Sequence, residues 1–258
     1  MQLLGRKKSS PEARARALQF ANYVKPKGTL TPKTPPVDWY SEVYSWPMYS
    51  NDTLGDCVCA ALGHLQNLWS KYATGVENVI PDSEIVAAYN VLSPQNDGVD
   101  MLTALQYMES TGIDGHKIAA YVALEPGNIA QAQLCIELFG AVFIGIEIPD
   151  AITSAPNMLN VPWDPPAGVS TTSGKWAPDP NNGHCIIAPG YLTGGSMGTH
   201  FPIVTWGQLT RMSESFYQTY SDEAYGVISA DWIKKNGVSP SGFDLKALLA
   251  DRAAIANA

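Results

Sequence analysis

The sequence has little charge, few cysteines and no long hydrophobic run. Charged residues make up 16% of its 258 positions and hydrophobic residues 45%, which excludes a mainly disordered chain. The most apolar run, residues 141–148, is too short to cross a bilayer, and no apolar stretch of the signal-peptide kind follows the basic residues at the start. We therefore expect a cytoplasmic or assembly-associated protein with no membrane partner, and the missing secretory features favour a bacterial or bacteriophage origin.

Four cysteines are too few for a dense disulfide framework. Cys57 and Cys59 stand too close together to be read as a disulfide staple, which favours a reducing compartment. The four histidines are widely scattered, so the Cys-x-Cys pair is a weak metal-binding pattern. We expect neither a metal nor a cofactor.

Turn-forming residues and hydrophobic periodicity together predict a mixed α+β protein. The 22 glycines and 19 prolines are too many for a pure helix bundle. Apolar residues recur at helical spacing over several segments, and short apolar runs of strand type follow in the second half. The predicted helices are 11–24, 57–72, 83–92, 100–110, 128–139 and 244–258, and the predicted strands are 141–148, 185–188, 201–205 and 224–229.

Basic residues are concentrated at the start of the chain. Residues 1–33 hold eight basic residues and one acidic residue, whereas the remainder holds eight basic and 23 acidic residues. Residues 25–36 are rich in Pro, Thr and Lys and predict an extended linker. The arm is either a solvated tail or a segment that docks on its own acidic body or on an acidic partner such as nucleic acid. The acidic body itself argues against a nucleic-acid-binding domain.

Cys57 is a candidate nucleophile because it follows Gly55-Asp56 and begins a strongly predicted helix. Unpaired amides and the positive end of the helix dipole favour a thiolate there. The alternative is a buried structural cysteine. Cys59 lies two residues along the same helix and points about 200° away, so it cannot face the same cleft.

His184 is the histidine best placed to accompany Cys57, because it follows the polar turn at 181–183 and precedes an apolar strand. The alternative is a loop histidine without a role. His64 lies about two helical turns from Cys57 and cannot easily reach its thiol. Cys185, next to His184, faces the other side of the strand and is read as core.

Several short motifs resemble, in order and spacing, those of the papain family of cysteine peptidases. The family's Q-x-x-x-G-x-C-W-A pattern is similar to residues 51–60, NDTLGDCVCA, and its V-D-W to residues 37–39. The family's H-A-V-x-x-V-G-Y is similar to residues 184–191, HCIIAPGY, and the end of N-S-W-G to residues 204–207, VTWG. Asn96-Asp97-Gly98 before a helix resembles the Gly-rich substrate-contact loop.

The resemblance implies a papain-like α+β fold, in which a helical subdomain and a β-rich subdomain with a barrel-like antiparallel sheet flank a cleft. The expected division is an arm and linker at 1–34, a papain-like domain at 35–243 with halves of about 51–115 and 116–243, and a helical tail at 244–258. Residues 1–34 are too short to resemble the family's inhibitory propeptide.

The resemblance also implies site roles. Cys57 as thiolate attacks a carbonyl of a peptide or protein substrate, and His184 protonates the leaving amine and then activates water. The Cys57 amide and the Asn51 side chain, which stands at the family's Gln position, form the oxyanion hole. The expected substrate-binding residues are Gly55, Gly98 and Trp206.

One departure from the family concerns the residue that orients the histidine. The family's Asn position is held by Val204, which cannot orient an imidazole, and a slip of one residue presents Thr205 instead. The alternatives are a backbone carbonyl or a carboxylate such as Asp222. Val58 also replaces the large Trp that follows the family's nucleophile.

Three function classes follow. The first is a cysteine peptidase or related thiol acyl-transfer hydrolase. The second is a catalytically weak or inactive papain fold that serves as a structural or binding module of a larger assembly, which the missing orienting Asn and the basic arm favour. The third comprises other Cys–His folds, such as peptidoglycan amidases or transglutaminase-like enzymes, which do not predict the V-D-W and W-G motifs.

Overall fold

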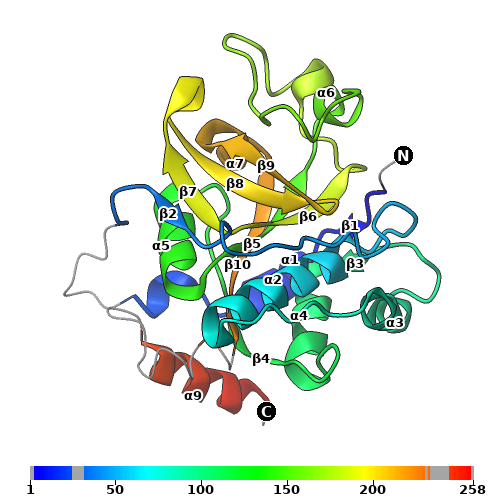
Figure 1. Ribbon diagram of the computed structural model, residues 1–258, viewed down its shortest axis with the longest axis vertical. Coiled ribbons are helices and arrows are strands. Elements are labelled where there is room, and N and C mark those ends of the chain that lie inside the picture. The colour runs from blue at the N-terminus through cyan, green and yellow to red at the C-terminus, as the bar shows by residue number, and fades with distance from the viewer. Residues whose placement is uncertain (1–2, 25–31, 230–231, 233–243, 257–258) are drawn as a thin grey trace.

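The computed structural model describes residues 3–24, 32–229, 232 and 244–256. An antiparallel sheet with helices packed around it forms the body of the molecule (Figure 1). Its strand order is β2-β7-β8-β6-β5-β10-β4, and β9 pairs with β8 outside this path. The strands are β2 Val37–Asp38, β4 Ile118–Ala123, β5 Val142–Glu147, β6 Gly183–Ala188, β7 Gly190–Thr193, β8 Thr199–Thr205, β9 Gln208–Ser213 and β10 Ser221–Ser229.

The helical elements include every helix predicted from residue 57 onwards. The helices are α1 Pro11–Arg16, α2 Cys57–Thr74, α3 Asp82–Leu92, α4 Met101–Ser110, α5 Ile129–Phe139, α6 Asp150–Thr153, α7 Glu214–Tyr220 and α9 Leu245–Ala256. Short 3₁₀ turns lie at Phe20–Asn22, Gly174–Trp176 and Gly195–Met197. No helix among the described residues combines the length and the apolarity that crossing a membrane requires.

Helix α2 is the central helix. Each of its residues from Cys57 to Ser70 is buried, and it packs on β6 and β8. A helix that is covered on all sides belongs to the interior, where its apolar residues contribute to the core over its whole circumference. Gly75 ends it in the left-handed conformation, with φ 81°, and its amide bonds to the Lys71 carbonyl.

Both faces of the sheet are buried at the central strands β5 and β6, and alternation along β5 assigns its side chains to the two sides. Val142, Ile144 and Ile146 belong to one hydrophobic cluster, whereas Phe143 belongs to the cluster built around α2. The strand therefore reads as an almost continuous apolar run, as predicted from the sequence.

The predicted helix at 11–24 is wrong in its second half. Helix α1 ends at Arg16, and Ala17 is extended, with φ −67° and ψ 137°. Leu18 accepts a hydrogen bond from the Ala123 amide at 2.7 Å, and Gln19 forms a parallel bridge to Ala123. Pairing with the edge strand β4 competes with helix formation here, and β4 itself was not predicted.

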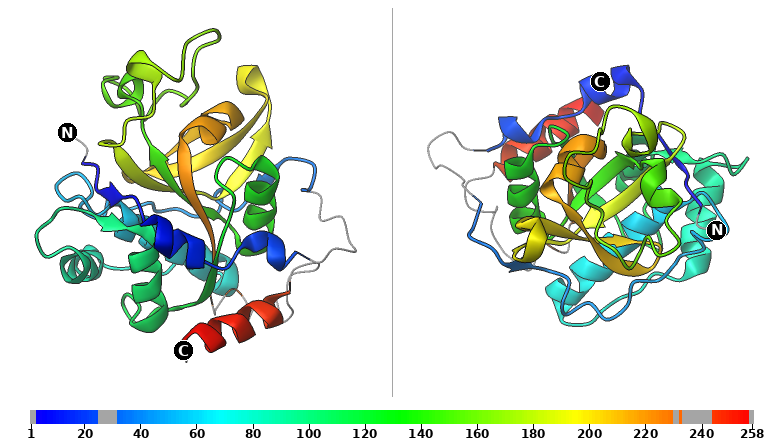
Figure 2. Two further views of the ribbon diagram at one scale, coloured as in Figure 1. Left: turned by 180° about the vertical axis from the view of Figure 1, so that it is seen from behind. Right: turned by 90° about the horizontal axis from the view of Figure 1, so that it is seen from above.

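The N-terminal segment, which we define as residues 3–9, crosses the body of the protein. Its strand β1, Arg6–Lys7, pairs in parallel with β3, Val99–Asp100. Seen from behind, the dark blue chain runs between the strands of the sheet and helices α3 and α4 (Figure 2). Of the predicted linker, residues 25–31 lie outside the described residues, as does the predicted domain boundary at 243.

Candidate active site

Cys57 is the first residue of α2, and its side chain is buried. Asp56, at the N-cap, makes no capping hydrogen bond with its side chain. Burial raises the pKa of the Cys57 thiol to about 11, while the backbone amides of Cys185 and Gly5 lie beside the sulfur and favour its thiolate. In this conformation Cys57 is a neutral thiol.

His184 lies on β6 and is completely buried. Its Nε2 is 2.7 Å from Oγ1 of Thr205, and its ring stacks on Trp206 with centroids 4.0 Å apart and planes 13° apart. Its Nδ1 is buried and has no hydrogen-bond partner. Burial, and then the charge of Arg6, lower the pKa of His184 to about 3, so the imidazole is neutral.

The strand pairing brings Cys57, His184 and Thr205 into one region. Strands β6 and β8 are antiparallel neighbours in the sheet, with Ile187 opposite Val204, and Thr205 lies within hydrogen-bond distance of His184. The Cys185 amide, one residue from His184, lies beside the Cys57 thiol because α2 packs on β6. The Cys185 side chain is buried in the cluster around α2, as expected for a core residue.

Comparison with solved structures identifies the architecture. Xylellain, a cysteine protease from Xylella fastidiosa, superposes with a TM-score of 0.67 at 13% identity, over 89% of this chain and 97% of that one. Bromelain from Ananas comosus, with the inhibitor E64, gives 0.55 at 13% identity over 76% and 99%, and procathepsin L 3 from Tenebrio molitor gives 0.54 at 13% over 84% and 77%. This chain has a papain-like fold. No protein-family model matches its sequence, and a search of curated proteins finds no significant match.

Asn51 lies in the loop that leads to the helix of this papain-like fold. It is buried, and its side-chain amide donates to the Leu54 carbonyl at 3.2 Å. One of the two N–H groups of the amide is therefore directed at the loop. The oxyanion role of Asn51 stays a prediction.

The N-terminal segment passes directly over this site. The Trp206 indole donates to the Leu3 carbonyl at 3.1 Å, and the Val99 amide donates to the Gly5 carbonyl at 2.9 Å. A Cβ on Gly5 would lie 1.8 Å from the carbonyl oxygen of Gly55. The three predicted substrate-binding residues Gly55, Gly98 and Trp206 therefore all line the path of this segment, a position of the arm that was not predicted.

Gly98 shows why that path needs glycine. Its φ is 90°, in the left-handed region, and a Cβ there would lie 2.2 Å from the Gly5 carbonyl oxygen. Any other residue at Gly98 would clash with the N-terminal segment.

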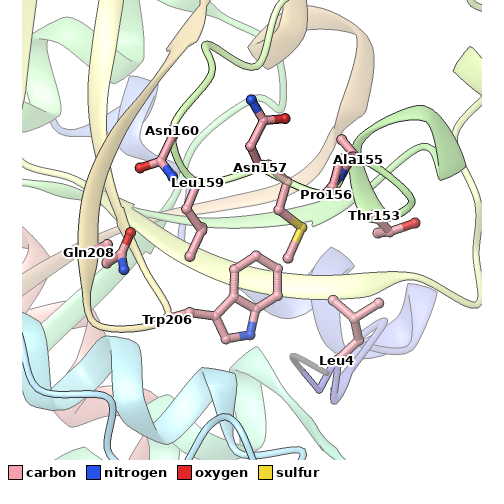
Figure 3. Close-up of a pocket in the computed structure, with 10 residues that line it drawn as sticks. Leu4, Thr153, Ala155, Pro156, Asn157, Leu159, Asn160, Trp206 and Gln208 are labelled. Atoms are coloured by element: carbon pink, nitrogen blue, oxygen red, sulfur yellow. The ribbon is translucent and has the colours of Figure 1, made fainter.

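Beside Leu4, the cleft continues into a pocket of about 270 Å³. Leu4 and Trp206 line this pocket with the loop at 153–160 (Figure 3). The Trp206 ring thus separates His184 from an open space that an extended chain could enter.

Basic residues of the N-terminal segment pair with carboxylates of the body. The side chain of Arg6, 1% exposed, lies 2.7 Å from Asp222 and 2.9 Å from Glu223. Lys8 lies 3.1 Å from Asp222 and 3.3 Å from Glu147. These residues of the arm therefore dock on the protein's own acidic body, which was one of the alternatives for the arm. An external acidic partner stays a prediction.

Asp222 was one alternative for orienting His184. Its carboxylate instead faces Arg6 and Lys8, and the partner of His184 Nε2 is the Thr205 hydroxyl. That hydrogen bond fits the orienting role predicted for Thr205, which stays a proposal for function.

Asp56 is a residue of the site that sequence reasoning missed. Its side chain is fully buried, and the Asn51 side chain lies beside its carboxylate and favours the charged form. Burial raises the pKa of Asp56 to about 7. The signal available in the sequence was an acidic residue directly before a candidate nucleophile, at the start of an apolar helix. Among the described residues, no three His, Cys, Asp or Glu side chains are grouped as a metal would require.

Proposed function

We propose that this chain is a papain-type thiol peptidase in which Cys57 is the nucleophile and His184 the general base and acid. The observation that carries the proposal is the arrangement of the imidazole. Its Nε2 is held by Thr205, its ring lies on Trp206, and its Nδ1 has no partner, on the strand that packs against Cys57. The comparisons support this function through the fold they share.

The chemistry follows from these positions. With its proton on Nε2, donated to Thr205, His184 offers the Nδ1 lone pair to the Cys57 proton. The thiolate adds to the carbonyl carbon of a peptide bond, and the oxyanion that forms is stabilised by the Cys57 amide and by Asn51. The imidazolium then protonates the leaving amine, and water activated by the imidazole releases the acyl group from sulfur.

The N-terminal segment has to leave before a substrate can enter. It contributes to the burial that keeps Cys57 a thiol, and the charge of Arg6 helps to keep His184 neutral. Displacement of the segment admits water, which relieves the burial that is the largest cause of both shifts, so the two pKa values move back toward each other. A thiolate–imidazolium pair becomes accessible in this open form.

E64, the inhibitor in the bromelain structure, offers a test of the nucleophile. The Gly5→Ala variant, in which the N-terminal segment should be displaced, is incubated with E64, and the labelled residue is located by mass spectrometry. We expect one equivalent on Cys57 and none in Cys57→Ala or His184→Ala. Labelling of Cys59 with equal speed, or cleavage of peptides by Cys57→Ala, would contradict the proposal.

A second candidate function is a papain-like binding module, which the filled cleft favours. Arg6 and the backbone of residues 3–6 occupy the path across Gly55 and Gly98 with buried ion pairs. If the segment never leaves, Cys57 stays protonated and the protein works through its surface. Absence of any thiol reactivity after the segment has been displaced would move the assignment to this module.

A further inference from the structure

Two adjacent carboxylates, Asp222 and Glu223, hold the buried guanidinium of Arg6 in the N-terminal segment. The Arg6 guanidinium donates to Glu223 through Nη1 at 2.9 Å, and its Nη2 forms an ion pair with Asp222 at 2.7 Å. Nη2 also donates to the Ile146 carbonyl at 3.3 Å. Three acceptors are thus arranged around a planar, forked cation.

The strand geometry explains how two consecutive residues reach one cation. Neighbouring side chains on a strand normally point to opposite faces. Between Ser221 and Glu223 the register of β10 against β5 shifts by a bulge, which re-aims the side chains there. The bulge lets Asp222 and Glu223 converge on the same guanidinium.

The surroundings leave a slot for a long side chain. Opposite the carboxylates, β5 carries Gly145, where a Cβ would lie 2.8 Å from Nη1 of Arg6. Glu223 is fixed from the body by Tyr225, whose hydroxyl donates to Oε2 at 2.8 Å. The N-terminal segment adds to this: the Ser9 amide donates to Oε1 of Glu223 at 2.8 Å, and Lys8 lies 3.1 Å from Asp222. The acidic groups and the glycine of the slot belong to the sheet.

Charge makes an empty slot unfavourable. The side chains of Glu223 and Asp222 are 1% and 13% exposed, so loss of Arg6 leaves Glu223 with little water and without its cation, and leaves Asp222 with Lys8. Buried like charges without a counterion are costly. A guanidinium reaches both carboxylates and the carbonyl at once, whereas a Lys ammonium lacks the planar fork.

We propose that the slot formed by Asp222, Glu223, Gly145 and the Ile146 carbonyl is a substrate subsite that selects an arginine side chain. This subsite rests on the proposed peptidase function. Gly5 precedes Arg6 and has its amide beside the Cys57 thiol, so the slot lies one or two residues from the scissile bond. The preferred substrate is a peptide with arginine at that distance and a small residue beside it, since the Gly55 backbone leaves no room for a Cβ on Gly5.

The test measures binding in the full-length chain carrying Cys57→Ala and Arg6→Ala, which removes turnover and empties the slot. Three peptides are titrated: LLGRKKS, LLGKKKS and LLGAKKS. We expect the arginine peptide to bind at least about tenfold more tightly than the alanine peptide and more tightly than the lysine peptide. The preference disappears when Asp222→Asn and Glu223→Gln are added. Equal affinity for the three peptides would overturn the subsite.

Two further variants keep the test decisive. Arg6→Lys replaces Arg6→Ala if the alanine variant does not fold, because the lysine keeps a cation beside the carboxylates. In Arg6→Lys, the arginine peptide should displace the N-terminal segment more readily than the lysine peptide does. Lys7→Ala is the matched control, because Lys7 is half exposed and pairs with the exposed Asp97. In Lys7→Ala, Arg6 should remain in the slot, and none of the three peptides should bind more tightly than to the native chain. Selective binding of the arginine peptide without reactivity of Cys57 would reject the peptidase function but keep the subsite. Reactivity of Cys57 without preference for the arginine peptide would reject the subsite but keep the peptidase function.

Discussion

His184 and Thr205 are joined by a hydrogen bond of 2.7 Å between Nε2 and Oγ1, although 21 residues separate them. The bond engages Nε2 of the imidazole and leaves Nδ1 without a hydrogen-bond partner, and stacking on Trp206 fixes the ring plane. A neutral hydroxyl thus occupies the place where a stronger acceptor is expected from the papain resemblance. The hydroxyl can hold the tautomer, but it stabilises an imidazolium less than an amide or a carboxylate does.

Replacement of Thr205 by alanine tests this relationship. We expect kcat/KM for peptide cleavage to fall by roughly tenfold or more, because the imidazole loses its fixed tautomer and orientation. Thr205→Ser should restore most of the activity, since it returns the hydroxyl. The limb of the pH–rate profile that reports the imidazole should shift in Thr205→Ala and return in Thr205→Ser. An unchanged rate in Thr205→Ala would remove the orienting role.

Asp56 should make the stability of the protein depend on pH. Its pKa is raised from an ordinary value of 3.8 to about 7, so the folded state holds the proton between these pH values and the unfolded state does not. The contribution of this group to the free energy of unfolding therefore falls as pH rises from about 4 to 7, by an order of 2–4 kcal/mol in total. Denaturant unfolding at several pH values measures this contribution.

Asp56→Asn is the matched variant for that measurement. His64 and His184 have lowered pKa values, about 4 and about 3, and contribute the opposite slope below pH 6.5. The difference between the native chain and Asp56→Asn isolates Asp56. We expect the variant to gain stability relative to the native chain as pH rises from 4 to 8. A difference that does not vary with pH would contradict the raised pKa.

Gly5→Ala should displace the N-terminal segment without changing its charge. The added Cβ would meet the Gly55 carbonyl oxygen at 1.8 Å, a contact that backbone atoms cannot relieve by a rotamer change. We expect trypsin to cleave after Arg6 at least about tenfold faster in the variant, because a buried bond becomes accessible. Lys7→Ala, which removes only a half-exposed ion pair, should leave cleavage after Arg6 nearly unchanged.

Gly145→Ala should narrow the slot around the guanidinium. The new methyl group would lie 2.7 Å from Sδ of Met101 and 2.8 Å from Nη1 of Arg6. In the chain with Arg6→Ala, we expect this change to weaken binding of LLGRKKS more than binding of LLGAKKS, because only the longer side chain needs the space. Equal weakening of both peptides would mean that the glycine serves the packing of Met101 alone.

Local pattern was enough to predict the helix at Cys57, the strand after His184 and their order along the chain. The helices between residues 57 and 110 and the strands of the second half could be predicted because each repeats its buried apolar residues at the spacing of its own secondary structure. Strand β4, IAAYVA, was missed because its residues carry no clear alternation and include three alanines.

The covered state of the cleft could not be predicted from local pattern. Arg6 meets Glu223 across 217 positions of sequence, and nothing near Arg6 indicates that it is buried. Asp56 likewise gains its raised pKa from elements that enclose it in the folded chain. Such long-range relationships arise from topology, which short motifs do not specify.

Alkylation of cysteine at about pH 5.5, followed by peptide mapping, decides whether Cys57 and His184 form an activated pair. An ordinary thiol reacts very slowly at this pH, whereas a thiolate–imidazolium pair reacts fast. We predict slow labelling of the native chain, fast labelling of Cys57 alone in Gly5→Ala, and loss of that labelling in Gly5→Ala with His184→Ala. If trypsin shows that the segment has left in Gly5→Ala and Cys57 still reacts no faster than the other cysteines, Cys57 and His184 do not form such a pair.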